Sequence, residues 1–297
     1  MTQPLKAIHE VLAPAKLNLF LHITGRRPDG YHLLQSVFML IDWCDTLHFE
    51  LRHDGLITRE DLGGEPGTEA LPADDLCVRA ARALQAATGT RLGVHIGLEK
   101  RIPAQAGMGG GSSDAASCLL ALQRLWGVRL APDALAALAL KLGADVPFFL
   151  SGGHAWAEGI GDQLTPISLP ASTFMVVKPP VGVSTPSIFA SPHLKRNTKT
   201  ATLAGFAAEH GEQTFRFGQN DLQPVAQQLS PLITQSLDWL EAQGLQGRMT
   251  GSGSAVFAQI PHELPHRLPA HTSQPKPPDE WIVKKCSNLE IHPLAGW

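Results

Sequence analysis

Short apolar or alternating runs in the first half of the chain predict β-strands at 17–23, 37–43, 46–52 and 94–99. Three longer stretches predict helices at 74–88, 114–126 and 132–141. Gly89 and Gly143 lie just after the predicted helices 74–88 and 132–141, and glycine is typical of helix ends. Pro132 begins the helix 132–141, and proline is typical of helix starts. Ser112 or Ser113 could cap the second.

The second half of the chain mixes the same two kinds of segment. Strands are expected at 154–158, 174–178, 249–260 and 281–284, and helices at 202–209 and 231–242. This mixture predicts the α+β class. The 297 residues suffice for two domains, since domains commonly have about 100–200 residues. We place them at 1–152 and 153–297. Six prolines in 261–279 argue against a regular helix there.

The composition narrows the class of protein. With 43% hydrophobic and 17% charged residues, the chain has the make-up of an ordinary globular protein. Its net charge of −3 and its lack of a basic block argue against a nucleic-acid partner. No stretch reaches the roughly 18 apolar residues of a membrane helix, so no membrane partner is expected. The four cysteines form no Cys-x-x-Cys pair, which favours reduced thiols and a cytoplasmic location.

A loop rich in glycine and serine lies between a predicted strand and a predicted helix. Its core is Gly107-Met108-Gly109-Gly110-Gly111-Ser112-Ser113. Glycines let the backbone approach a ligand closely, and the free N–H groups of the following helix favour an anion. The loop lacks the lysine of a Walker motif, and the dinucleotide pattern would need glycine at Ser112. Phosphate binding is therefore predicted, with a glycine turn that merely caps the helix as the alternative.

The longer run Pro103-x-x-x-Gly107-Met108-Gly109-Gly110-Gly111-Ser112-Ser113 resembles the phosphate-binding motif of the GHMP kinases, where leucine usually stands at the position of Met108. The resemblance implies a two-domain α+β fold with the active site in the interdomain cleft. It also implies that ATP, as co-substrate, binds to this loop, and that magnesium accompanies it, with Ser113 as a candidate ligand. Lys100 could contact the nucleotide or could be a solvated lysine at a strand end.

Lys16 and Asp145 are the candidate catalytic residues. Strand periodicity puts Lys16 and Asn18 on one face, which could also be the solvated face of an edge strand. The run 13–21 and the run Gly143-Ala144-Asp145 both resemble GHMP motifs, although Asp145 could instead cap a helix. The resemblance implies that Asp145 orients and deprotonates an alcohol while Lys16 stabilises the developing charge.

The run Pro28-Asp29-Gly30-Tyr31-His32 is similar to the signature of one branch of this family, whose small-molecule substrate carries cytidine diphosphate and is phosphorylated on the 2-hydroxyl of a methylerythritol unit. This implies that Tyr31 stacks on cytosine, that His32 reads its polar edge, and that Phe189 closes the other face. Asn18 and Thr185 are further candidate substrate contacts. Tyr31 could instead pack over its own loop, and Phe189 could be a core residue.

Two rival functions stay open at this point. The chain could be another GHMP kinase, acting on homoserine or mevalonate, or a nucleotide-binding protein of the same fold without activity. The run 249–257 also resembles a GHMP glycine motif, with a strand bend as its alternative. One departure from the family is Asp75, where asparagine is common near the nucleotide. The His-Glu-x-x-His pattern at 262–266 is not expected to bind zinc, because Pro265 interrupts the helix such a site needs.

Overall fold

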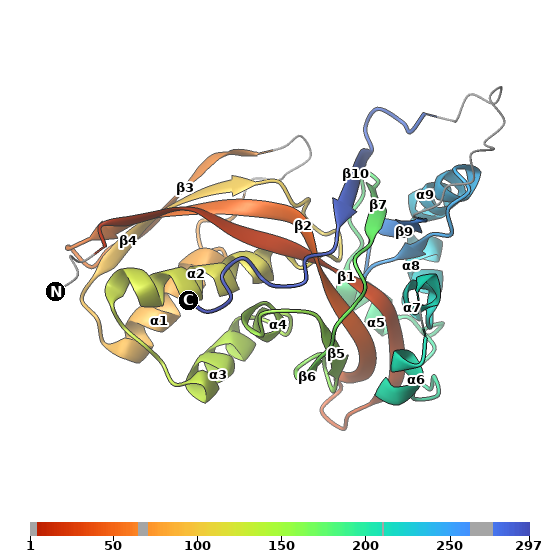
Figure 1. The fold of residues 1–297 in the computed structure, drawn as a ribbon, viewed down its shortest axis with the longest axis horizontal. Coiled ribbons are helices and arrows are strands. Elements are labelled where there is room, and N and C mark those ends of the chain that lie inside the picture. The colour runs from red at the N-terminus through yellow and green to blue at the C-terminus, as the bar shows by residue number, and fades with distance from the viewer. Residues whose placement is uncertain (1–4, 65–70, 210, 262–275) are drawn as a thin grey trace.

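The computed structural model describes residues 5–64, 71–209, 211–261 and 276–297, and its strands form two β-sheets (Figure 1). In the larger sheet β3, β4, β2, β5 and β6 are neighbours in that order, and β1 also pairs with β2. Only β3 and β4 are parallel. The strands of this sheet are β1 (Ala7–Arg26), β2 (His32–Arg52), β3 (Ile57–Gly64), β4 (Gly93–Lys100), β5 (Ala155–Glu158) and β6 (Gln163–Pro166).

Four helices lie along one face of the larger sheet (Figure 1). They are α1 (Leu76–Thr88), α2 (Gly110–Trp126), α3 (Pro132–Leu142) and α4 (Val146–Leu150). Their apolar sides and the facing side chains of the sheet make one buried cluster. The α2 helix contributes most of its circumference to it, because it lies between the sheet and its neighbouring helices.

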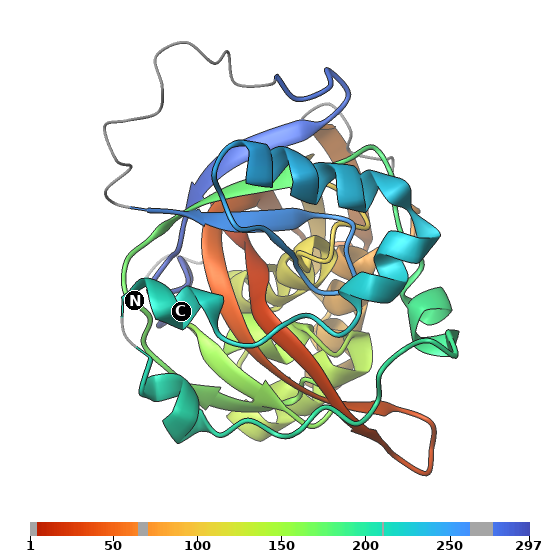
Figure 2. The ribbon, with the colours of Figure 1, turned by 90° about the vertical axis from the view of Figure 1, so that its right-hand side faces the viewer.

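The smaller sheet is antiparallel, in the order β10 (Ile282–Ser287), β7 (Thr173–Lys178), β9 (Val256–Ile260) and β8 (Arg248–Met249). Helices α8 (Gln223–Leu229) and α9 (Pro231–Ala242) cover one face of it and share a buried cluster with its strands (Figure 2). Three short helices complete the described part of the chain, α5 (Thr185–Ala190), α6 (Leu203–Ala207) and α7 (Glu212–Arg216).

The hairpin of β1 and β2 joins the two halves of the molecule. The sequence predicted three separate strands here, and the structure has two continuous ones of 20 and 21 residues, paired with several register shifts. Leu17 and Leu19 of β1 belong to a buried cluster that also contains Phe174 and Phe257 of the smaller sheet. Because side chains alternate along a strand, Lys16 and Asn18 then face the opposite way.

The predicted helices α1, α3 and α9 and the strands β4, β5, β7 and β10 are confirmed within one to three residues. The predicted serine cap of α2 is wrong: the helix begins earlier, after Gly109, whose φ of 71° needs glycine, and it has no side-chain cap. The predicted strand at 249–260 is also interrupted, because residues 250–255 form a turn between β8 and β9.

Residues that follow the predicted domain boundary at 152/153 belong to the larger sheet. Strands β5 and β6 follow residue 152 in sequence but add to the edge of β2. The last residues also return to this half, where Asn288 bridges Ile41 and Ile291 bridges Gly153. The division at 152/153 stays a prediction. The pattern at 262–266, and most of the proline-rich segment, lie outside the described residues.

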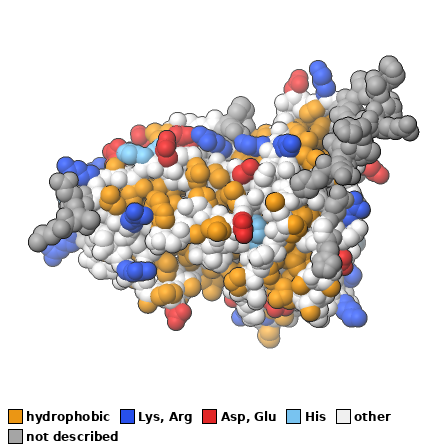
Figure 3. Space-filling model, in the orientation of Figure 1, with side chains coloured by type: hydrophobic (Ala, Val, Ile, Leu, Met, Phe, Trp, Pro, Cys, Tyr) orange, Lys and Arg blue, Asp and Glu red, His pale blue; other side chains and the backbone are white. Residues whose placement is uncertain are grey.

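On the face seen in Figure 3, acidic and basic side chains are interspersed. Among the described helices none is long and apolar enough to cross a membrane. The four cysteines are free thiols, three of them buried, in agreement with the sequence prediction.

Candidate active site

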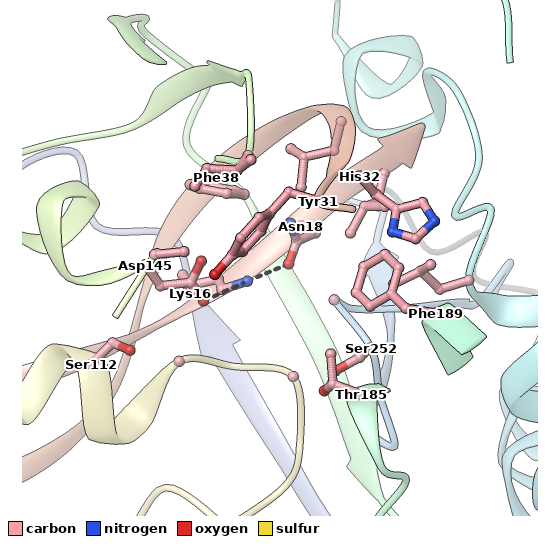
Figure 4. Close-up of a pocket in the computed structure, with 18 of the residues that line it drawn as sticks. Lys16, Asn18, Tyr31, His32, Phe38, Ser112, Asp145, Thr185, Phe189 and Ser252 are labelled. Carbon is pink, nitrogen blue, oxygen red and sulfur yellow. Dashed lines mark hydrogen bonds and ion pairs between the residues drawn. The ribbon is translucent and has the colours of Figure 1, made fainter. Parts of the chain in front are cut away.

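A cavity of about 730 Å³ lies between the β1–β2 hairpin, the glycine loop and the segment that carries α5. It collects all seven residues that the sequence predicted for catalysis and substrate binding. They are Lys16, Asn18, Tyr31, His32, Asp145, Thr185 and Phe189. Figure 4 shows Lys16 between Asp145 and Asn18, with His32 and Phe189 on the other side of the cavity.

Lys16 is held as a buried cation at one end of this cavity. Its side chain is 4% exposed, so the alternative of a solvated strand face is wrong. Its Nζ lies 2.5 Å from Asn18 Oδ1 and 3.5 Å from Asp145 Oδ2, and it sits 4.9 Å from the centre of the Phe38 ring. A charge held by two oxygen groups in a dry site interacts strongly with a phosphate, because little water screens it.

Asn18 is fixed by two neighbours that the sequence did not identify as its partners. Its Nδ2 donates to Ser36 Oγ at 2.8 Å, and the Ser36 hydroxyl donates in turn to Phe20 O at 2.5 Å. Its backbone N–H donates to Thr250 Oγ1 at 2.9 Å. Since the single hydroxyl hydrogen of Ser36 is already used, Ser36 accepts from Asn18, and the amide oxygen must face Lys16.

Asp145 stands at the N-terminal end of α4 but does not cap it. No side-chain cap bond is present, so the capping alternative is not supported, and one third of the carboxylate remains exposed to the cavity. Pro147 in the first turn of α4 removes one backbone N–H that a cap would serve. The carboxylate is thus available to an incoming hydroxyl beside a lysine ammonium.

A second cavity, of about 760 Å³, lies on the other side of the glycine loop. The predicted ATP contacts that line it are Lys100, Pro103, Gly107, Met108, Gly109, Gly110, Gly111 and Ser112. Five residues line both cavities: Gly107, Gly109, Ser112, Thr185 and Ser252. The two spaces therefore meet at one wall, formed by the loop and by the Thr185–Ser252 pair, whose hydroxyl oxygens are 2.7 Å apart.

Close contact between two glycine segments shapes this wall. Gly107 has a φ of +74°, and a Cβ placed there would lie 2.3 Å from Thr250 O. Gly251, with a φ of +54°, has the same relation to Gly107 O, at 2.7 Å. The turn in the run 249–257 therefore approaches the glycine loop closely, and neither position admits a side chain without strain.

Lys100 is buried, which contradicts the solvated alternative. Its Nζ forms ion pairs with Asp45 and, at 2.7 Å, with Asp114. Burial alone would lower the pKa of Lys100, but the two carboxylates raise it above its usual value. Burial raises the pKa of Asp114, despite the neighbouring ammonium. Asp45 Oδ1 also accepts the N–H groups of Arg101 and Ile102, so this cluster anchors the start of the glycine loop.

The two serines of the loop differ in position. Ser112 lines both cavities, whereas Ser113 lines neither and is fully buried. The Ser113 hydroxyl has no hydrogen-bond partner among the described residues. Ser113 lies in the first turn of α2, one residue from the cavity wall, and its assignment to magnesium stays a prediction.

Tyr31, His32 and Phe189 border the far end of the first cavity. Tyr31 is 59% exposed, so it does not pack tightly over its own loop. His32 and Phe189 stack on each other, with ring centres 4.8 Å apart and planes inclined by 27°. Phe189 is only partly buried. An exposed tyrosine and a histidine–phenylalanine stack offer π faces to a flat ligand.

Asp75 lines the second cavity and has two partners. Its Oδ1 accepts the N–H of Val78 as the N-cap of α1, and its Oδ2 lies 3.0 Å from Arg59. An aspartate at this position, where the family commonly has asparagine, therefore forms a buried ion pair with Arg59. Neither Arg59 nor Asp45 could be found from sequence, since each acts across a long stretch of chain.

Comparisons with known proteins agree with this geometry. The family models "GHMP kinases N terminal domain" and "GHMP kinases C terminal" match residues 75–153 and 198–266. The 4-diphosphocytidyl-2-C-methyl-D-erythritol kinase of Polaromonas sp. strain JS666 is 71% identical over 99% of this chain and 96% of its own length. The enzyme of the same name from Polaromonas naphthalenivorans is 70% identical over 100% of this chain and 98% of its own length.

Solved structures extend the comparison. A crystal structure of 4-(cytidine 5'-diphospho)-2C-methyl-D-erythritol kinase, 37% identical, has a TM-score of 0.70 and covers 84% of this chain and 90% of its own. Homoserine kinase from Cytophaga hutchinsonii, at 18% identity and a TM-score of 0.64 over 88% of this chain and 87% of its own, shares the fold. With the two cavities that meet at the glycine loop, these similarities show that the chain belongs to the GHMP kinase family and, within it, to the group of 4-diphosphocytidyl-2-C-methyl-D-erythritol kinases.

Proposed function

We propose that this enzyme transfers the γ-phosphoryl group of ATP to the 2-hydroxyl of 4-diphosphocytidyl-2-C-methyl-D-erythritol. The position of Lys16, between Asp145 and Asn18 and beside the wall that both cavities share, carries this proposal. One cavity would hold ATP and the other the cytidine-bearing alcohol. The full-length relatives with that name support the choice of substrate.

The reaction would proceed at the shared wall. Asp145 accepts the proton of the 2-hydroxyl as the hydroxyl oxygen forms a bond to the γ-phosphorus of ATP. The bond between the γ-phosphorus and the bridging oxygen of the β-phosphate breaks, which releases ADP. Lys16 compensates the negative charge on the attacking oxygen and on the transferred group. Asn18 fixes the direction of the lysine ammonium. The loop Gly107–Ser113 would present backbone N–H groups to the phosphates.

Magnesium fits the oxygen donors at this wall. Bound with ATP, the ion takes most of its ligands from phosphate and water and needs only one or two from the protein. The Ser112 hydroxyl, which lines both cavities, is an oxygen donor of the right kind, whereas the Ser113 hydroxyl is buried and lines neither cavity. The ion would neutralise phosphate charge. Among the described residues no group of three or more acidic, histidine or cysteine side chains forms a separate metal site.

The remaining substrate contacts follow the sequence prediction. We assign the cytosine to the end of the first cavity that Tyr31 and Phe189 border, with His32 at its polar edge and Thr185 near the diphosphate. Since His32 and Phe189 stack directly on each other in this structure, the base would enter beside that pair, over the exposed face of Tyr31. The cytoplasmic location stays a prediction.

A coupled assay of ADP release tests the function. Purified protein should turn over ATP with 4-diphosphocytidyl-2-C-methyl-D-erythritol and should be inactive with homoserine and with mevalonate. Turnover of either alternative alcohol, without turnover of the cytidine substrate, would contradict the proposal. A protein that binds ATP but turns over none of the three would favour the non-catalytic rival.

Replacing the proposed base tests the mechanism. Asp145→Asn should lower kcat by about 10²–10⁴-fold, the usual contribution of general acid–base catalysis, while the dissociation constant of ATP stays unchanged. The exposed Asp133 at the start of α3 provides the matched control, and Asp133→Asn should leave both quantities unaltered. An unaffected kcat in the Asp145→Asn variant would remove Asp145 from the role of base.

A further inference from the structure

Arg196 connects the two sides of the region to which the cytosine is assigned. Its Nε donates to Nε2 of His32, at the start of β2, at a distance of 3.0 Å. Its other two nitrogens donate to the carbonyls of Phe189 (2.9 Å), Ser191 (2.8 Å) and Leu194 (3.0 Å), where α5 ends. One guanidinium thereby holds both members of the His32–Phe189 stack.

The contact with Arg196 determines what His32 can offer a ligand. Arginine never accepts a hydrogen bond, so Nε2 of His32 must be the acceptor and carries no proton. Burial and the nearby charges of Arg196 and Arg26 lower the pKa of His32, which keeps the ring neutral. In a neutral imidazole with a bare Nε2, the proton resides on Nδ1. His32, which lines the first cavity, therefore carries its N–H donor on Nδ1.

We propose that Arg196 is a positioning residue that sets the nucleobase preference of this site, by holding His32 as an Nδ1–H donor. A donor suits a base whose ring nitrogen is an acceptor, as N3 of cytosine is, and opposes the N3–H of uracil, since two donors would then face each other. The inference rests on the proposed function, because it assumes that the cavity receives the cytidine end of the substrate.

Binding of CDP and UDP, measured by calorimetry, tests this role. Wild-type protein should bind CDP more tightly than UDP. In Arg196→Met the preference should fall by about tenfold, the equivalent of one well-placed hydrogen bond. The KM of the cytidine substrate should rise, while kcat and the KM of ATP stay unchanged. The exposed Arg129 gives the matched control, and Arg129→Met should leave the preference intact.

Three further variants separate recognition from simple support of α5. Arg196→Lys retains one donor for His32 and should recover part of the preference. His32→Ala should lose it, and adding Arg196→Met should then cause no further loss of preference. If Arg196 only stabilises the segment after α5, Arg196→Met weakens CDP and UDP equally, which overturns the inference.

The outcomes also separate this inference from the proposed function. Wild-type turnover of the cytidine substrate, with an unchanged CDP-to-UDP ratio in Arg196→Met, overturns the role of Arg196 alone. No turnover and no CDP preference in the wild-type protein overturn the proposed substrate, and the role of Arg196 with it.

Discussion

At the scale of single residues, Ser36 in β2 orients the catalytic Lys16 through the side-chain amide of Asn18 in β1. Ser36→Ala removes the acceptor that faces Asn18 Nδ2, so the amide is no longer forced to turn its oxygen toward Lys16. We expect kcat to fall about tenfold with little change in either KM, and the free energy of unfolding to fall by about 1–3 kcal/mol, because a buried donor loses its partner. Steady-state kinetics and urea denaturation measure the two effects.

A second substitution makes this prediction specific. If Ser36 acts through Asn18, the double variant Ser36→Ala with Asn18→Ala should have the same kcat as Asn18→Ala alone. Independent, additive losses in kcat would contradict the chain of contacts from Ser36 to Lys16.

At the scale of elements, the glycine loop depends on its approach to the turn between β8 and β9. Gly107→Ala puts a methyl group against Thr250 O and forces alanine to a φ of +74°, so the free energy of unfolding should fall by at least about 1–3 kcal/mol. Thermal unfolding of the ligand-free protein measures it.

The control for this substitution lies four residues away in the same loop. Gly111 is in α2, and a Cβ there meets only a side-chain carbon at 3.4 Å. Gly111→Ala should be neutral or stabilising by up to about 1 kcal/mol, since alanine favours a helix more than glycine does. Equal losses of stability in the two variants would show that the contact with Thr250 is not the cause.

At the scale of the whole molecule, two buried histidines make the fold sensitive to acid. Burial lowers the pKa values of His154 and His292 to about 4, from 6.5. Each accepts a backbone N–H through Nδ1, from Leu40 and Leu294 respectively, and both remain neutral in the folded protein. Because the unfolded chain binds their protons more readily, stability is complete above pH 6.5 and is lost as the pH falls toward 4.

Urea denaturation between pH 7.5 and pH 5 checks this linkage. The free energy of unfolding should decrease by about 2 kcal/mol per histidine at pH 5, on the way to a full loss of about 3 kcal/mol below the folded pKa of about 4. His154→Asn keeps an acceptor for the Leu40 N–H but does not titrate, so its stability should vary less with pH. A wild-type stability that is constant over this range would contradict the prediction.

Local patterns predicted much of the fold, and the family resemblance indicated site residues of which the structure brings all but Ser113 to the two cavities. Period-two alternation placed Lys16 and Asn18 on one face, and the glycines of 107–111 indicated the cradle, since both signals are local. The unbroken β1 and β2 were missed because their bulges and turn-forming residues interrupt the apolar pattern.

Contacts between distant parts of the chain left no such local signal. Asp45, Ser36 and Arg196 contact partners 16 to 164 residues away, which only the tertiary structure brings near. The serine cap predicted for α2 failed for a local reason, because the helix begins directly after the left-handed Gly109 and has no side-chain cap.

The wall common to the two cavities has a consequence for inhibition. On the proposed assignment, two nucleotides meet there end to end, with only Gly107, Gly109 and Ser112 and the Thr185–Ser252 pair between them. A single compound with adenosine at one end and cytidine at the other, joined by an acidic linker, would occupy both spaces at once. Such a linkage makes the second contact intramolecular and can raise affinity about 10²–10⁴-fold over either half.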